Sequence, residues 1–153
     1  MSVTIAIEPA RQSAVIGLLE QSDRYMEALY PPESNHLVDI AALEKPQVRF
    51  HVARHEGRIV GCAALVLAGD GTAEIKRMFV DPAARGLKIG RLLMEALAAT
   101  ATGEGLSAIR LETGIHQPEA IGLYRSGGYV EIAPFGDYKP DPLSLFMEKT
   151  LVR

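Results

Sequence analysis

The sequence predicts a mixed α/β fold, in which helices cover a central, mostly antiparallel sheet. Strand-like and helix-like segments alternate through all 153 residues without a repeat or a low-complexity tract. Residues 80–94 have the pattern of an apolar strand end, a loop rich in glycine and cations, and an amphipathic helix. This length is typical of one domain whose core needs neither disulfides nor metals. We therefore expect a single domain over residues 1–153.

The N-terminal half is predicted to contain a strand, two helices and three further strands. Residues 3–7 form a short strand, and Pro9 follows where a helix can start. Apolar residues at helical spacing continue to Leu29, and Pro31-Pro32 ends this helix. A short helix is expected within residues 35–43. A β-hairpin is expected over residues 48–54 and 58–67, followed by a strand at 72–80.

The C-terminal half is predicted to alternate in the same way. A helix over residues 87–102 is followed by a strand at 107–112 and a helix at 119–126, which Gly127-Gly128 ends. Strands are then expected at residues 129–133 and 143–149.

The loop at residues 85–91 has the composition of an anion-binding site. Gly86 and Gly90 let the main chain approach a ligand, and the start of a helix offers unpaired N–H groups at the positive end of its dipole. Arg85, Lys88 and Arg91 add donors suited to phosphate. A P-loop is excluded because no Lys-Ser/Thr pair follows Gly90, and the G-x-G-x-x-G fingerprint is absent. The loop predicts a pyrophosphate ligand, with a solvated basic turn as the alternative.

This loop resembles the acetyl-CoA loop of the GNAT family of N-acetyltransferases, Gln/Arg-x-x-Gly-x-Gly/Ala. Arg85 and Gly90 fit its ends, while Lys88 stands where the first motif glycine is usual. The family's second motif, Asn-x-x-Ala-x-x-Leu-Tyr-x-x-x-Gly-Phe/Tyr, begins here with Gln117 in place of Asn and is matched at Ala120, Leu123, Tyr124, Gly128 and Tyr129. The predicted elements also follow the family's order, βααβββαβαβ, and the chain is identified as a member.

The resemblance implies a sheet that is splayed between its fourth and fifth strands, with acetyl-CoA as co-substrate in the gap. The pantetheine arm would pair with backbone near Met78, Phe79 and Val80, and Gln117 and Ala120 would lie at the cofactor. The pyrophosphate would be held by the loop residues Arg85, Gly86, Leu87, Lys88, Ile89, Gly90 and Arg91.

Two side chains are expected to carry proton transfer. In the family the tyrosine at the position of Tyr124 protonates the departing thiolate; the alternative here is a tyrosine that only packs on the sheet. Glu74 stands where several members hold a base that deprotonates the acceptor amine, and its alternative role is an ion pair with Lys76 or Arg77. Glu112 at a strand end either faces the acceptor or caps the next turn.

The strand at residues 72–80 has three charges in the middle of a core-like sequence, which indicates that it lines a cleft. Period two places Glu74, Lys76, Met78 and Val80 on one face and Ile75, Arg77 and Phe79 on the other. A bulge, which the family carries in this strand, would shift that alternation by one residue.

Two irregular segments, residues 29–36 and 134–142, are expected to wall the acceptor site. Their aromatic, acidic and imidazole side chains suit an ammonium ion, namely Tyr30, Glu33, His36, Asp137 and Tyr138. Capping or turn chemistry is the alternative, with Ser34 or Asn35 as an N-cap and Asp137 in an Asx-turn. Arg77 is a candidate for binding an acceptor carboxylate.

The bulk properties exclude several other classes of function. A net charge of −3 argues against a nucleic-acid binder. Cys62 is the single cysteine and reads as a core residue, so no disulfide or Cys-based zinc site is expected, and the four histidines form no metal set. The N-terminus has no signal-peptide pattern, and no apolar stretch is long enough to span a bilayer. A cytoplasmic protein without membrane or nucleic-acid partners is expected.

Together these features predict an acetyl-CoA-dependent N-acetyltransferase that acts on a primary amine of a small molecule by direct attack in a ternary complex. One alternative is a peptide or protein N-acetyltransferase, for which an open groove would be expected rather than a closed pocket. The other is a non-catalytic acyl-CoA-binding regulatory module. The family resemblance also makes a homodimer an expectation.

Overall fold

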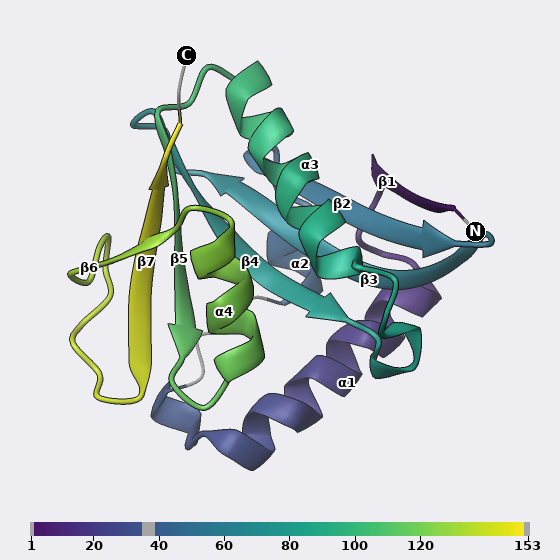
Figure 1. Cartoon of the computed structure of the whole chain (residues 1–153), viewed down its shortest axis with the longest axis horizontal. Coiled ribbons are helices and arrows are strands. Elements are labelled where there is room, and N and C mark those ends of the chain that lie inside the picture. The colour runs from purple at the N-terminus through teal and green to yellow at the C-terminus, as the bar shows by residue number, and fades with distance from the viewer. Residues whose placement is uncertain (1, 35–38, 152–153) are drawn as a thin grey trace.

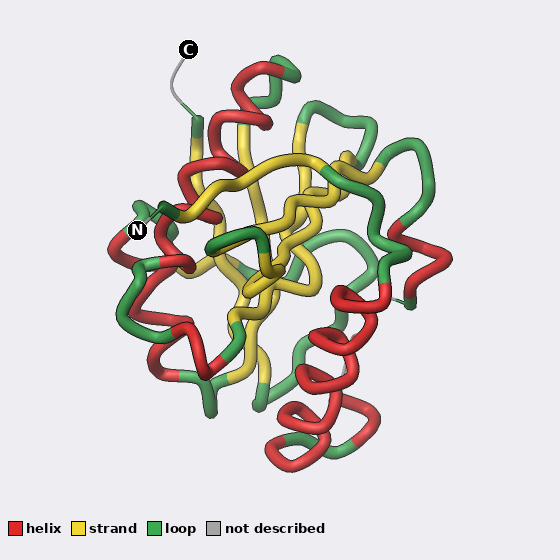
Figure 2. Tube along the Cα trace, turned by 90° about the vertical axis from the view of Figure 1, so that its right-hand side faces the viewer, coloured by secondary structure: helices red, strands yellow, loops and turns green. Residues whose placement is uncertain are grey.

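In the computed structural model, which describes residues 2–34 and 39–151, helices pack on both faces of a single mixed sheet (Figures 1 and 2). Within these residues seven strands follow the order β1-β2-β3-β4-β5-β7-β6. Neighbouring strands are antiparallel except for β4 and β5, which are parallel. The predicted mixed, mostly antiparallel fold is confirmed.

The elements follow the order of the predicted segments, including both C-terminal strands. Written out, this order is βααβββαβαββ, one strand more than the family order βααβββαβαβ. The strands are β1 (Val3–Ile7), β2 (Val48–His55), β3 (Arg58–Leu67), β4 (Thr72–Val80), β5 (Ala108–Gly114), β6 (Val130–Ile132) and β7 (Ser144–Thr150). The helices are α1 (Ser13–Leu29), α2 (Ile40–Leu43), α3 (Ile89–Gly103) and α4 (Pro118–Ser126), with 3-10 turns η1 (Pro32–Ser34) and η2 (Pro82–Ala84).

Two buried clusters fill the space between the sheet and its helices. The larger joins α3 and α4 to one face of the sheet, with Leu93 and Leu97 fully buried against Leu65 and Ile109. The smaller joins α1 and α2 to the opposite face. It includes Cys62, which is fully buried as predicted for a core residue. Alternate residues of β2 and β3 enter different clusters, as expected for strands buried on both faces.

Strands β4 and β5 separate towards their C-terminal ends (Figure 1). Their pairing covers only Thr72 to Ile75 on β4, and the last pair joins Ile75 to Leu111. A register shift between β3 and β4 pairs Cys62 with Phe79 but Ala64 with Lys76, which leaves one extra residue in β4. Arg77 in this bulge has φ +55°, the left-handed conformation that few side chains adopt. The splay predicted from the family resemblance is therefore present.

The bulge corrects the predicted faces of β4. Ile75, Met78 and Val80 all pack against the cluster under α3 and α4, so Met78 and Val80 lie on the face of Ile75 rather than with Glu74 and Lys76. The one-residue insertion reverses the alternation after Lys76, because side chains on a strand alternate with period two.

Local capping explains most differences between the predicted and observed helix ends. Helix α3 begins at Ile89 rather than residue 87 because Lys88, its N-cap, has φ +57°. Helix α2 is capped by Asp39, whose carboxylate accepts from the Ala42 N–H at 2.9 Å, rather than by Ser34. The other predicted cap, Asn35, lies outside the described residues. The predicted helix residues 35–38 lie outside the described residues.

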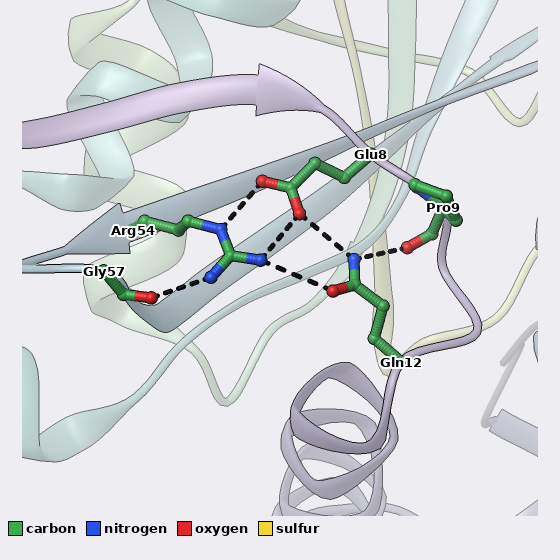
Figure 3. Close-up of polar contacts among 5 residues, drawn as sticks. All are labelled: Glu8, Pro9, Gln12, Arg54 and Gly57. Carbon is green, nitrogen blue, oxygen red and sulfur yellow. Dashed lines mark hydrogen bonds and ion pairs between the residues drawn. The ribbon is translucent and has the colours of Figure 1, made fainter.

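A polar cluster joins the start of α1 to the ends of β1 and β2 (Figure 3). The Arg54 guanidinium donates to both oxygens of Glu8 at 2.9 and 2.8 Å and to the Gly57 carbonyl at 2.7 Å. The Gln12 amide donates to Glu8 and to the Pro9 carbonyl. The hydrogen bond from Arg54 holds the pKa of Glu8 below its usual range. This bidentate pair fixes where α1 leaves the sheet.

His51 connects β2 to α3 from a buried position. Its Nε2 lies 2.8 Å from the Thr100 hydroxyl, and its Nδ1 lies 2.9 Å from the Arg49 carbonyl oxygen. Burial lowers the pKa of His51, although the bond to the Arg49 carbonyl opposes this shift. The neutral imidazole is therefore favoured in the folded protein.

This arrangement predicts an acid-sensitive contribution to stability. The contribution is complete above the unfolded-state pKa of His51, about 6.5, and is lost as the pH falls, by up to about 1.4 kcal/mol per pH unit. Between pH 7.5 and 5 the unfolding free energy of the wild type should therefore fall more steeply than that of His51→Gln, as measured by urea denaturation. Parallel pH dependences in the two proteins would contradict this role for His51.

Candidate active site

Three cavities border strands β4 and β5, two of them where the strands are splayed and one beside their paired part. We name them by position: the loop cavity next to residues 85–90, the central cavity between the separated strands, and the outer cavity under the β6–β7 loop. Their volumes are about 590, 80 and 920 Å³, in that order. Met78, Gln117 and Tyr124 line both the loop and central cavities, and Lys76 lines both the central and outer cavities. The shared residues place the three cavities next to one another.

The loop cavity collects most of the residues predicted to hold the cofactor. Its lining includes Met78, Phe79, Val80, Arg85, Gly90, Gln117 and Ala120. Beyond Ile75 the main chain of β4 has no ladder partner in β5, so residues 76–80 present an unpaired strand edge to this space. An extended chain with amide groups, such as pantetheine, has the chemistry to pair with that edge.

The remaining predicted loop residues shape the turn rather than line the cavity. Gly86 has φ +89°, Leu87 packs against the core under α3, and Ile89 is buried. Arg91 is exposed on the first turn of α3, where it lines a shallow hollow between α3 and α4. Arg85 lies 3.8 Å from Glu119 in an exposed ion pair that a phosphate could replace.

Two positions explain why the family motif favours glycines here. Lys88 adopts φ +57° and ψ +33°, a conformation in which glycine carries no steric cost. A side chain at Gly90 would bring its Cβ to 2.9 Å from Leu123 of α4. Lys88 therefore keeps the backbone turn while adding a positive charge at the start of α3, where the helix dipole is also positive.

Tyr124 lies where the loop and central cavities meet. It is 7 % exposed, and its ring is tilted against that of Tyr129 with centroids 6.0 Å apart. Burial, reinforced by the negative charge of Glu112, raises the pKa of Tyr124 to about 12. The phenol is thus fully protonated at neutral pH, as a proton donor must be.

Glu112 is a candidate residue for which two roles were predicted, facing the acceptor or capping the next turn. It lines the central cavity together with Tyr124, and its Oε2 accepts a hydrogen bond from the Ser144 hydroxyl at 2.8 Å. Its charge raises the pKa values of both Tyr124 and Tyr138. The signal in the sequence was a charged residue near the end of an apolar strand, but only the splay turns that position towards the cavity.

Glu74 lies in the outer cavity, engaged with two neighbours. The Tyr138 hydroxyl donates to Glu74 Oε2 at 2.5 Å, and Lys76 Nζ lies 3.2 Å from the same oxygen. Lys76 also contacts the Tyr138 hydroxyl and lies 4.8 Å from the centre of its ring. The ion pair with Lys76, the alternative role predicted for Glu74, is present, whereas its role as a base stays a prediction.

The two segments predicted to wall the acceptor site both border the outer cavity. Glu33 of η1 and Asp137 and Tyr138 of the β6–β7 loop line it. Ser34 donates to Asp141 at 2.7 Å, which ties one segment to the other. Phe135, Tyr138 and Phe146 form edge-to-face contacts behind this wall. His36 lies outside the described residues.

Tyr30 and Arg77 line the central cavity but are also held by the protein itself. Tyr30 stacks on His116, accepts the His116 N–H at 2.9 Å and fills the space where a Cβ on Gly114 would lie. The Arg77 side chain is 5 % exposed, with Nη1 2.6 Å from Asp23 on α1. These contacts fix α1 against the splayed strands, and the acceptor roles of both residues stay predictions.

Across residues 2–34 and 39–151, no three His, Cys, Asp or Glu side chains are grouped so that they could hold a metal ion. Among the helices that the structure describes, none has the length and apolar character needed to cross a membrane.

The sequence profile of the Acetyltransferase (GNAT) family matches residues 15–129. An IAA acetyltransferase of Azospirillum brasilense is 54% identical over 151 residues, which cover 98% of this chain and 99% of the relative. The uncharacterized N-acetyltransferase YedL of Escherichia coli is 32% identical, over 94% of this chain and 89% of its own. The crystal structure of a putative acyl-CoA N-acyltransferase from Klebsiella pneumoniae superposes with a TM-score of 0.83 at 37% identity, over 98% of each chain. The fold and these relatives agree, and the chain belongs to the GNAT family of acetyltransferases.

Proposed function

We propose that this acetyltransferase moves an acetyl group from acetyl-CoA to a primary amine of a small molecule, by direct attack in a ternary complex. The observation that carries the proposal is the set of three neighbouring cavities. The loop cavity offers the free edge of β4 and the Arg85 side chain to a CoA arm, and the outer cavity offers acidic and aromatic side chains to an amine. The central cavity, beside Tyr124, shares lining residues with both. Holding both reactants in one site supplies much of the rate of such a reaction.

The chain's own groups can balance the protons of this transfer. The unprotonated amine nitrogen attacks the thioester carbonyl, so that a C–N bond forms and the C–S bond breaks. The amine gives up one proton to a carboxylate, and the CoA thiolate receives one from the Tyr124 hydroxyl. The raised pKa of Tyr124 keeps that proton in place until the thiolate forms. The unpaired edge of β4 after Ile75 offers N–H groups that can polarise the carbonyl.

Two carboxylates are candidates for the proton acceptor. Glu74 lines the outer cavity, from which the amine would arrive, while Glu112 lines the central cavity with Tyr124. We propose that Glu112 takes the proton at the point of transfer, because it shares that cavity with the proposed acid. Glu74 anchors the acceptor as an ammonium ion and accepts its first proton, directly or through a water, which frees the nitrogen lone pair for attack.

A small acceptor is favoured over a peptide because the two wall segments are bonded to each other. The Ser34 hydroxyl after α1 donates to Asp141 of the β6–β7 loop, and Asp141 lines the outer cavity. Glu33 and Asp137 on the exposed rim, with the ring of Tyr138 beneath, suit a cationic guest. The single-domain organisation, the cytoplasmic location and the homodimer expected from the sequence accompany this proposal as predictions.

Thermal unfolding with and without acetyl-CoA is the first test, since it needs no choice of acceptor. Acetyl-CoA at about a hundred times its Kd should stabilise the protein by roughly 2.7 kcal/mol. The matched variant Arg85→Gln should reduce this shift, whereas Arg11→Gln, on the surface away from the cavities, should leave it unchanged.

CoA release is then assayed with a panel of primary amines and with IAA, the acceptor in the name of the Azospirillum relative. Binding without CoA release from any of these acceptors would favour the regulatory module, and a folded protein without any shift would contradict the proposal.

Tyr124→Phe separates proton donation from packing. The ring is kept and only the hydroxyl is removed, so acetyl-CoA affinity by calorimetry should be unchanged while kcat falls by roughly 10²-fold or more. The loss should be smaller for thioester donors whose thiol is more acidic, because a better leaving group needs less protonation. Equal kcat in the variant and the wild type would remove Tyr124 from the mechanism.

Glu112→Gln and Glu74→Gln distinguish the two carboxylates. If Glu112 accepts the proton, its variant loses kcat by about 10²-fold with little change in the acceptor KM, while Glu74→Gln mainly raises that KM. The reversed pattern would assign the base to Glu74. Glu104→Gln is the control, because Glu104 holds Arg49 at 2.5 Å and neither residue lines any of the three cavities.

A further inference from the structure

Lys76 occupies the junction through which an acceptor would reach the point of transfer. Of the residues that the structure describes, it alone lines both the outer and the central cavity. Its side chain is 19% exposed, so most of it is covered by the protein. A positive charge at this place is unexpected in a cavity that is proposed to receive an amine.

The contacts of Lys76 are those of a complete binding site for an ammonium ion. Glu74 supplies a carboxylate oxygen at 3.2 Å, Tyr138 supplies its hydroxyl, and the ring of Tyr138 lies 4.8 Å from the nitrogen. The Tyr138 hydroxyl gives its own proton to Glu74 at 2.5 Å, so its lone pairs are left to accept from an N–H. Burial, together with the bond to Glu74, raises the pKa of Tyr138, which keeps this phenol neutral.

The site is also held in place from behind. Tyr138 packs edge-on against Phe135 and Phe146, with ring centroids 5.2 and 5.3 Å away. Phe146 belongs to β7 and is buried, so the ring that faces the ammonium is fixed to the sheet. Such a site is preorganised, because neither the carboxylate nor the ring has to move to bind a cation.

We propose that Lys76 is a placeholder in the acceptor's ammonium site, and that the acceptor's R–CH₂–NH₃⁺ group displaces it from Glu74 and Tyr138. This inference rests on the proposed function and adds the class of acceptor: an unbranched primary alkylammonium, since the group already seated there is the end of a lysine chain. Arylamines lack the positive charge that the site uses, and quaternary ammonium ions lack the N–H groups. Lys76 is thus a specificity-determining residue, because an acceptor binds only if its ammonium group competes successfully with Lys76 for Glu74 and Tyr138.

The other charges of the outer cavity fit this displacement. Arg110 is engaged by Glu148 at 2.7 Å and lies over Phe135, so it does not compete for Glu74. Glu33 and Asp137 stand on the exposed rim and attract a cation towards the junction. Lys139 lines the same cavity as an exposed cation and offers a matched control for the loss of one positive charge.

Chemical rescue tests the ammonium site without any knowledge of the acceptor. Lys76→Ala should vacate it, and ethylammonium chloride should then raise the Tm of the variant by about 2 °C or more relative to sodium chloride at the same concentration. Tetramethylammonium chloride should not do so, and neither Lys139→Ala nor the double variant Lys76→Ala/Glu74→Gln should respond to ethylammonium. No rescue, or equal rescue in Lys139→Ala, would overturn the proposal.

The Lys76→Met variant keeps the aliphatic stem, and its kinetics test whether the acceptor displaces Lys76. This variant also covers the case in which Lys76→Ala does not fold. With 2-phenylethylamine as acceptor, KM should fall several-fold, while the Kd of acetyl-CoA stays unchanged. Lys139→Met should lower KM less, because it removes charge without vacating the site. An increased or unchanged KM in Lys76→Met would overturn the proposal. If the wild type releases no CoA with this or any other amine, the proposed function fails, and the rescue experiment still decides the ammonium site.

Discussion

The site depends on one structural constraint, the loss of pairing between β4 and β5 after Ile75. Parallel strands in a sheet normally continue side by side, and here a one-residue bulge ends the pairing by turning the second half of β4 away from β5. All three cavities border the strands that this break separates. Without it Tyr124 and Glu112 would face a closed sheet, and residues 76–80 would have no unpaired edge.

The bulge is costly and is held from several directions. A non-glycine residue with φ near +55° carries strain of roughly 1–3 kcal/mol. The Arg77 side chain is nearly completely buried and bound to Asp23 of α1 at 2.6 Å, and the Arg77 carbonyl accepts from the Cys62 thiol at 3.4 Å. Burial raises the pKa of that thiol to about 12, so Cys62 stays protonated and inert. Helix α1 thus fixes the bulge as well as covering the sheet.

The sequence predicted the parts of this protein that depend on local patterns. Period two located the strands, prolines and glycines marked the turns, and two motifs located the loop at residues 85–91 and Tyr124. The faces of Met78 and Val80 were wrong because a bulge is a property of two paired strands and leaves no local signature. The start of α3 was two residues early, because a lysine in a left-handed conformation cannot be recognised from its type.

The contacts between distant segments were likewise beyond the sequence. Glu74 and Tyr138 are 64 positions apart, and Glu112 shows its place only once β4 and β5 have separated. The ion pair of Lys76 with Glu74 was predicted as an alternative role of Glu74. The contact of Lys76 with the ring of Tyr138, which comes from the β6–β7 loop, was not predicted. Such clusters depend on sheet order, which places β4 and β7 on either side of β5.

The most direct test of the account is backbone hydrogen exchange with and without saturating acetyl-CoA. If the splay is where the cofactor binds, exchange should slow at residues 76–80 on the free edge of β4 and at residues 85–91 around the start of α3. The antiparallel pair of β1 and β2 should be unaffected. Slowed exchange confined to other parts of the chain, or no change at all, would contradict the assignment of the splay as the cofactor site.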